Sequence, residues 1–570
     1  MSRSLRIVAP LLLIAALAIA GGSQVAGSLF AQEEAPVAPA APAGPETPAG
    51  PPTLANLVPE GALAFIRIND LAKLDAEVLE LVKIIEPEEV DDASIKANLG
   101  KVMSNPDLEG VDLDQPVGIA MFMSAMGPMP IVIMSLSDPA AFSVRTAGNE
   151  SVKVVGPFAA WARSPGVLEG VKVAEKPSPL FAQLRDGDVS VAVNMEVVGP
   201  MIIPMLGQLD MIVEMIRQQA GDAVGDMYAG MVAEMKTAIA DTAGLNVAAN
   251  LRGGKLDVTY RYVPKEGSAT AKKIAEAKVT RKSYLGYIDS ADFMAIDMKV
   301  PGSELWESFA SIYGGMFKDP EMLEMVKQSF LLLDGMAVGI SFDGGASETF
   351  AMGVTNEEEY AKLIDLMPKH FDEMMKSMAE MMPEGQELPF DMGFTQGEPW
   401  EYGGVKVRSF SIKMAMKESE SPEVPPEAVD AMKKMFAKML GGETIDYHLA
   451  ILDGMAVGAV GVGARERTVA LIEMVKSGRP GLPPAAVASA MAGFPADAHM
   501  KFFMDVSPLL RLISDLPKIP EEAKPLLANA PAGLGLSFYV AKDGAAVDLG
   551  YRVDLKLIAS YAAKWVQIRK

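Results

Sequence analysis

The feature that most constrains this fold is an order of dissimilar segments that occurs twice along the chain. Each series opens with an alternating strand pattern followed by a helix pattern, continues with a hairpin pattern, and then reaches a second pair of strand patterns. These segments lie at 63–85, 117–136 and 152–163 in the first series, and at 293–313, 336–354 and 447–462 in the second. A shared order of unlike segments predicts an internal duplication.

Both series also end on a similar motif. After a Gly-containing turn, residues 256–261 and 547–552 both read apolar-Asp-apolar-x-Tyr-Arg. Residue 63 aligns with 293, whereas 256 aligns with 547, so the second series contains extra residues. We place this insert at about 367–443 and expect it to be helical, because it is rich in methionines at helical spacing.

One heptapeptide, Leu-Asp-Gly-Met-Ala-Val-Gly, is present at 333–339 and again at 452–458. Asp-Gly is a favoured two-residue hairpin turn, and the residues after it alternate as strand residues do. We therefore predict a hairpin turn at both places.

These patterns predict an α+β fold of two tandem, duplicated halves, 54–280 and 281–570. Alternating strands joined as hairpins indicate antiparallel sheets with one face covered by helices. The alternative is a single large mixed domain in which the similarity is accidental.

The N-terminal residues have the pattern of an export signal. Arg3 and Arg6 precede an apolar run at 7–20, and small residues at Ala18 and Ala20 form an A-x-A cleavage pattern, with Ala31 as a second candidate site. We predict a cleaved signal peptide over 1–31, with a retained N-terminal anchor as the alternative. The Pro- and Ala-rich residues 32–53 have too few large apolar side chains to build a core and are predicted to be a disordered linker.

The composition of the chain excludes several kinds of site and argues against one class of partner. The chain has no Cys, which excludes disulfides, thiolate zinc sites, iron–sulfur clusters and a lipidated cysteine. Its formal charge of -23 argues against nucleic acid as a partner, because binding a phosphate backbone needs positive charge.

The 39 methionines gather on a few predicted helices. Those at 201–215, 227–235 and 432–439 recur every three or four residues, which places them on one helix face. The favoured interpretations are core packing or an adaptable apolar surface for a protein or lipid partner, because Met fills irregular gaps and suits promiscuous surfaces. A soft-metal (copper) site is the lesser alternative. Its candidate ligands are His370, Met374, Met375, Met378, Met381 and Met382.

Three further motifs are predicted to be structural. Gly458, Gly461 and Gly463 follow a strand but lack the acidic residue that a dinucleotide loop needs about 20 residues later. Residues 105–110 have the oxygen spacing of half a calcium loop, yet Pro116 stands where its bidentate Glu belongs. The three His are far apart in sequence, and His448 and His499 are expected to be half-buried strand residues.

The openings at 57–68 and 494–498 look like those of a group of exported bacterial proteins without an assigned activity. In that group a Pro-x-Asp/Glu start before an apolar strand recurs, followed by hairpins with an Asp-Pro helix start, as at Asp138-Pro139. This resemblance implies an envelope location and assigns no catalytic residue. We therefore expect an exported, non-catalytic protein, periplasmic or extracellular, with a binding or structural role and no cofactor. The alternatives are a periplasmic carrier of an apolar ligand such as a lipid, and a Met-rich copper-binding protein.

Overall fold

The computed structural model describes residues 53–58, 61–85, 87, 93–124, 127–280, 282–313, 320–342, 345–380, 390–416, 442, 444–514, 516 and 519–569. The predicted signal peptide and all of the predicted linker except Thr53 lie outside these residues. So does most of the last part of the predicted insert.

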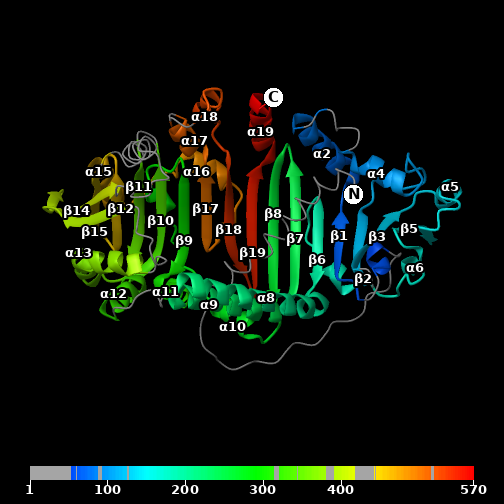
Figure 1. Cartoon of the computed structure of the whole chain (residues 1–570), viewed down its shortest axis with the longest axis horizontal. Coiled ribbons are helices and arrows are strands. Elements are labelled where there is room, and N and C mark those ends of the chain that lie inside the picture. Colours follow the sequence, from blue (N-terminus) through cyan, green and yellow to red (C-terminus); the bar gives the residue numbers. More distant parts are fainter. Residues whose placement is uncertain are drawn as a thin grey trace.

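Within the described residues, one antiparallel sheet of 19 strands runs from one end of the molecule to the other (Figure 1). From one edge to the other, the strand order is β4-β5-β3-β2-β1-β6-β7-β8-β19-β18-β17-β9-β10-β11-β16-β15-β14, with β12 and β13 both on the outer side of β14. The sheet passes from the first part of the chain to the second where β8 pairs with β19. The prediction of an α+β fold with antiparallel strands is therefore confirmed.

The strands divide into two groups along the chain. The first group is β1 (Ala64–Ile68), β2 (Val117–Ser124), β3 (Gly127–Ser135), β4 (Val152–Val155), β5 (Phe158–Ala162), β6 (Val189–Asn194), β7 (Thr242–Arg252) and β8 (Lys255–Pro264). The second group is β9 (Met294–Pro301), β10 (Leu333–Ser341), β11 (Ser347–Val354), β12 (Phe390–Gln396), β13 (Trp400–Tyr402), β14 (Val405–Met416), β15 (Thr444–Leu452), β16 (Met455–Gly461), β17 (Met500–Asp505), β18 (Gly535–Asp543) and β19 (Ala546–Asp554).

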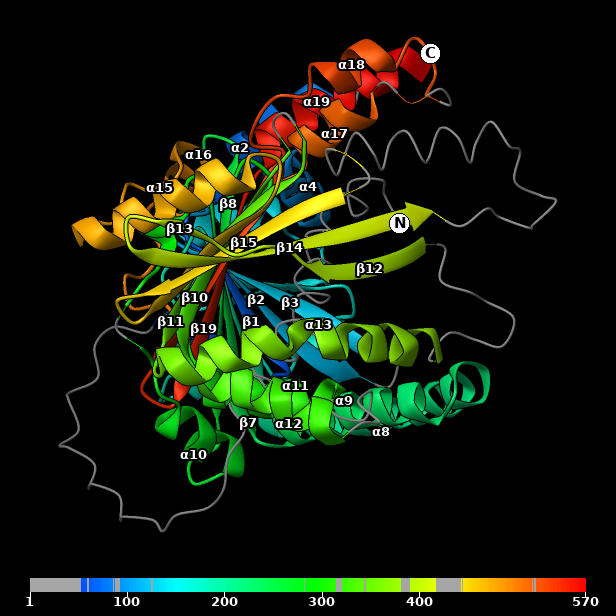
Figure 2. The same cartoon turned by 90° about the vertical axis from the view of Figure 1, so that its left-hand side faces the viewer.

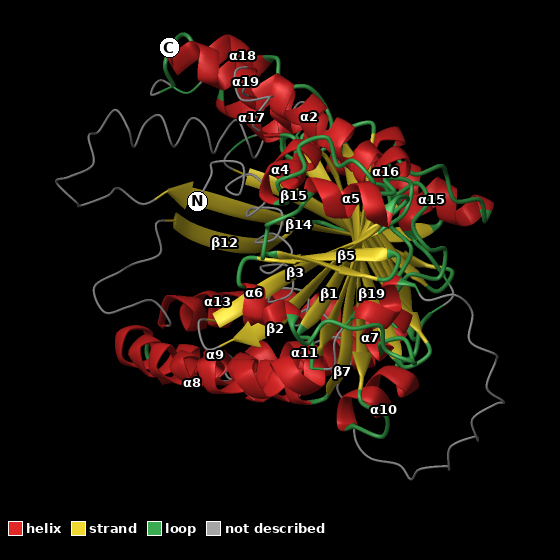
Figure 3. Cartoon of the chain, turned by 90° about the vertical axis from the view of Figure 1, so that its right-hand side faces the viewer, coloured by secondary structure: helices red, strands yellow, loops and turns green. Residues whose placement is uncertain are grey.

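Helices gather in two rows at opposite ends of the strands (Figures 2 and 3). The upper row in these views contains α2 (Leu71–Ile85), α4 (Ile95–Val102), α15 (Ala464–Ser477), α16 (Ala485–Ala490), α17 (Ser507–Ile513), α18 (Lys524–Ala528) and α19 (Leu555–Arg569). The lower row contains α8 (Met195–Ala220), α9 (Asp222–Ala240), α11 (Gly302–Tyr313), α12 (Pro320–Leu331) and α13 (Glu357–Glu380). Shorter elements are η1 (Leu54–Leu57), α5 (Pro139–Arg145), α6 (Pro165–Leu168), α7 (Pro179–Ala182), α10 (Ala269–Glu276) and η3 (Leu285–Tyr287).

Local capping chemistry explains one predicted helix start. Asp138 lies just before α5, and its carboxylate accepts hydrogen bonds from the backbone N–H groups of Ala140 and Ala141 at 3.0 and 2.9 Å. Pro139 occupies the first helical position, where a missing N–H costs nothing. The prediction of a helix starting at Asp138-Pro139 is confirmed.

The two copies of the Asp-Gly heptapeptide adopt different structures. Asp453 and Gly454, with φ of 50° and 71°, form the tight turn between β15 and β16, as predicted. Asp334 and Gly335 instead lie inside β10, where the pairing register shifts. The predicted hairpin turn is wrong there, because helix α12 rather than a strand precedes the motif.

The predicted helical insert at 367–443 is wrong in its middle. Helix α13 ends at Glu380, and residues 390–416 form β12, β13 and β14, which extend the sheet beyond β15. The side chains of Val407 and Phe410 are fully buried by this pairing. Alternating apolar residues in β14 favour a strand, and the methionine spacing on either side of it does not extend across it.

Candidate functional site

Helices α8 and α9 form a long hairpin that lies across the lower ends of the central strands (Figure 1). Helix α8 follows β6 directly, and α9 leads into β7. Gly221, with φ of 88°, makes the turn between the two helices. Because β6 and β7 are neighbours in the sheet, both ends of the hairpin are held at the same end of the strands.

The hairpin pairs charged side chains within itself. Lys236 of α9 contacts Asp210 of α8 at 2.7 Å. Arg217 contacts Glu214 at 2.7 Å and Asp226 of α9 at 2.8 Å. The hydrogen bond with Asp226, and then the one with Glu214, raises the pKa of Arg217. All charged residues of α8 after Glu196 therefore lie in ion pairs inside the hairpin.

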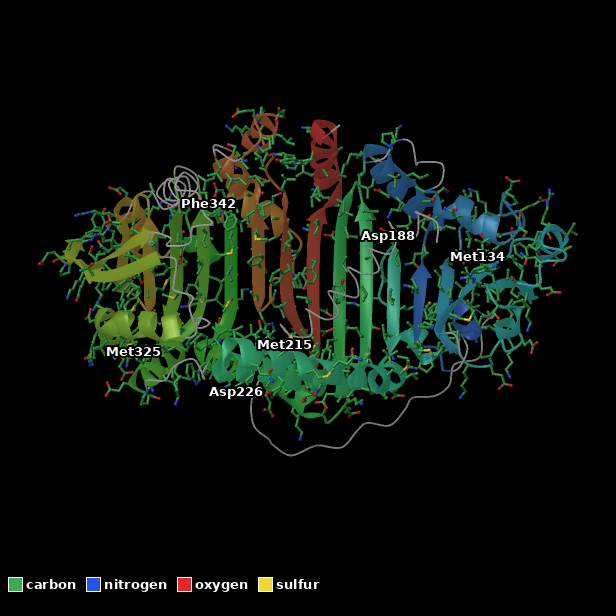
Figure 4. The ribbon with its side chains drawn as sticks, viewed as in Figure 1. Met134, Asp188, Met215, Asp226, Met325 and Phe342 are labelled. Atoms are coloured by element: carbon green, nitrogen blue, oxygen red, sulfur yellow. The ribbon has the colours of Figure 1, made fainter. Side chains whose placement is uncertain are left out.

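Apolar side chains of α8 face outward. Met201, Met211, Ile212 and Met215 are exposed, with Met211 69% and Met215 50% accessible. Together with Pro204 they lie on one helix face, which also carries the exposed, uncharged Gln208. We call Met201, Pro204, Met211, Ile212 and Met215 the α8 stripe. Figure 4 shows Met215 on the hairpin at the lower edge of the sheet and Met134 among the strands.

For the methionines of α8, exposure distinguishes core packing from an apolar surface. Core packing does not account for Met211 and Met215, which are exposed, whereas Met103, Met134 and Met322 elsewhere are buried. In the described chain, the α8 stripe therefore lies at the surface and not in the core. On α9, Met231 and Met235 are half-buried.

The copper candidates lie on or beyond α13. His370 is buried in this helix. Met374, Met375 and Met378 are within its backbone, but their side chains are outside the described part of the structure, and Met381 and Met382 lie outside it entirely. Among the described residues, no group of three or more His, Asp and Glu side chains is placed to hold a metal ion.

Helix α8 also has the length and composition of a membrane span. Within the described chain, Met195–Gln218 is the one helix that passes this test, and only 12% of its apolar window is buried. A core helix of this composition would be mostly covered, so most of α8 lies at the surface of the described chain.

A second cluster, which sequence patterns missed, is buried in the sheet. Asp297 and Lys299 of β9 lie on the same strand face, and Lys501 of β17 is directly opposite Asp297. Ser283 donates a hydrogen bond of 2.8 Å to Asp297, and Lys299 Nζ donates one of 2.6 Å to the carbonyl of Ala496. Charged residues at the inward positions of otherwise apolar strands were the available signal.

Burial shifts the pKa values of Asp297 and Lys501 in this cluster, and that of His499. It raises the pKa of Asp297 and lowers the pKa of Lys501, which also lies near Lys299. Burial, and then the charge of Lys542, lowers the pKa of His499 to about 4. Asp297, Lys299 and His499 are buried, whereas Lys501 is half-buried.

The three motifs predicted to be structural have structural contacts. The side chain of Asn105 closes a turn by bonding both backbone polar groups of Glu109. Gly461 and Gly463, both with positive φ, turn the chain from β16 into α15. His448 accepts a hydrogen bond from Trp400 Nε1 at 3.4 Å and is buried rather than half-buried, as is His499.

A shallow, open hollow lies between α13, β14 and the β15–β16 turn. Glu357, Lys406, Arg408 and Asp453 are among its lining residues. Arg408 contacts Asp365 at 2.6 Å, and Glu357 accepts from the Gly454 backbone at 2.5 Å. These side chains are committed to local contacts, so the hollow is a weaker candidate than the α8 stripe.

Comparisons with protein-family models, with the sequences of curated proteins and with solved structures found no significant match to this chain. The candidate site therefore stands on geometry alone.

Proposed function

We propose that this is an exported, non-catalytic protein that uses the α8–α9 hairpin as a binding surface for an apolar partner. The observation that carries the proposal is the α8 stripe, which is exposed and uncharged while the charges beside it are paired within the hairpin. Several exposed apolar side chains gathered on one helix face are typical of interaction surfaces, and Met adapts to varied partners.

Crosslinking in the host tests this proposal. A photoreactive amino acid replaces Met211 on the stripe or, as a control, Val144 on α5, which is 76% exposed. We expect an adduct, protein or lipid, at position 211 and none at 144. Equal adducts at both positions, or none at 211, would contradict the proposal.

The export part of the proposal is tested separately. The mass of the protein recovered from its host distinguishes cleavage after Ala20 or Ala31 from a retained anchor. A chain found intact and inside the cell would contradict export. Native mass spectrometry of the same sample tests the two carrier alternatives, since a retained lipid or copper ion adds its mass.

We also propose that the two halves, 54–280 and 281–570, are copies of one unit. The strand order supports this proposal: around β1 it is 4-5-3-2-1-6-7-8, and around β9 it is 15-16-11-10-9-17-18-19. At the junction, Asp257 contacts Arg552 at 2.6 Å, and the corresponding pair, Asp548 and Arg261, lies 3.6 Å apart. An experimental structure tests the duplication: superposing the halves has to align the strands that contain Tyr260 and Tyr551.

A further inference from the structure

We infer that the partner of the α8 stripe is the surface of a lipid bilayer with electrically neutral headgroups. This inference rests on the proposed function and names its partner. The α8 stripe forms a ridge along one helix. From Met201 to Met215 this ridge is about 21 Å long at the usual helical rise per residue. A ridge of this kind suits a planar surface, which contacts it along its whole length.

The direction of the chain argues for lying on the bilayer rather than crossing it. Both ends of the hairpin are fixed to β6 and β7, at one end of the sheet. Crossing would carry the Asp210–Lys236 pair and the Arg217 pairs into hydrocarbon, whereas lying flat leaves them at the headgroup level.

The net charge of the hairpin indicates which lipid headgroups it can approach. Its described charged side chains include Glu196, Asp210, Glu214, Asp226 and Glu234 against Arg217 and Lys236, so it is acidic overall. Anionic lipids would repel it, and neutral headgroups would not. The attraction is then apolar burial alone, which is insensitive to salt.

The absence of Cys from the sequence permits a clean test on the full chain. An environment-sensitive dye is attached to Met211→Cys on the stripe or to Val144→Cys as the control. We expect phosphatidylcholine vesicles to shift the emission of the dye at 211 to the blue and to leave the dye at 144 unchanged. Adding anionic phosphatidylglycerol is expected to weaken the response, and salt to leave the response to neutral vesicles unchanged.

A second variant measures the contribution of the stripe. Ile212→Gln combined with Met215→Gln, in the Met211→Cys chain, is expected to weaken vesicle binding about tenfold or more, since each apolar side chain gives up buried area. Unchanged binding would overturn the inference.

Other outcomes separate this inference from the proposed function. A blue shift at 211 that rises with protein concentration in the absence of vesicles would identify a second copy as the partner, and would overturn the lipid inference alone. No shift at 211 with vesicles, or an equal shift at 144, would overturn it as well. Host crosslinking at 211 to a protein would then leave the proposed function standing.

Discussion

Two regions of the molecule occupy comparable places in the sheet: the residues between β6 and β7, and those between β17 and β18. They differ in whether their apolar side chains are buried. Strand β6 pairs with β1, and β17 pairs with β9. In the second region, Leu534 and Ala530 are buried together with Tyr561 of α19, whose hydroxyl donates to the carbonyl of Leu526 at 3.1 Å. In the first region, the α8 stripe faces outward.

The helix that follows the last strand of each half explains the difference. Helix α19, after β19, has 15 residues and covers α17 and α18. Helix α10, after β8, has eight residues, and its buried Ile274 packs against the sheet instead. An apolar helix face becomes core only where another element covers it, so α8 retains an exposed one.

The largest expected effect comes from deleting a side chain in the covered region. Leu534→Ala is expected to lower the free energy of unfolding by about 2–5 kcal/mol, because the side chain is buried and leaves a cavity. Met211→Ala on the exposed stripe is the matched control and is expected to change it by less than about 0.5 kcal/mol. Urea unfolding followed by circular dichroism measures both, and a comparable loss in the two variants would show that α8 is covered.

The second effect concerns acid stability. His499 has a folded-state pKa of about 4, below its ordinary value of 6.5, because it is buried near Lys542. As pH falls from 6.5 to 4, the unfolded state takes up a proton that the native state resists, so stability decreases by up to about 3 kcal/mol from this group.

His499→Gln isolates this contribution, because the raised pKa of Asp297 acts in the opposite direction in both proteins. The variant is expected to lose less stability than the wild type over this pH range. Equal losses, measured by urea unfolding at pH 4 and 7, would mean that the burial of His499 does not govern acid stability.

The smallest expected effect is the loss of stability when ion pairs between β8 and β19 are removed. Arg552→Ala removes the ion pair with Asp257, and Arg261→Ala removes the ion pairs with Asp548 and Asp543. The two arginines are partly exposed, so each lost ion pair is expected to cost about 1 kcal/mol or less. A large cost for one and none for the other, in thermal unfolding, would argue against equivalent roles.

Much of the fold was predictable, because strands and caps leave local signals. The alternation at 63–68 and 189–194 predicted β1 and β6, and Asp138-Pro139 predicted the start of α5. The strands at 390–416 were missed because the methionines on either side indicated helix, although Val405 and Val407, and then Phe410 and Ile412, recur at every second residue as in a strand.

The candidate site was less predictable. Helical spacing places Met201, Met211 and Met215 on one face, but it contains no information about whether another element covers that face. Burial of Asp297 opposite Lys501 likewise depends on strand pairing between residues about 200 positions apart. Both features arise from tertiary packing, which local patterns do not encode.

Methionine oxidation tests the central claim, that the α8 stripe is uncovered in the isolated chain and covered by its partner. The full chain is treated with hydrogen peroxide, and the oxidation rate of each Met is followed by peptide mass spectrometry. Met211 and Met215 are expected to oxidise much faster than the buried Met103 and Met134.

Phosphatidylcholine vesicles are then expected to slow oxidation at Met211 and Met215, while the rate at Met123, which is exposed on β2, stays the same. Oxidation of Met211 as slow as that of Met134 in the isolated chain would contradict the account, because the stripe would then be part of the core.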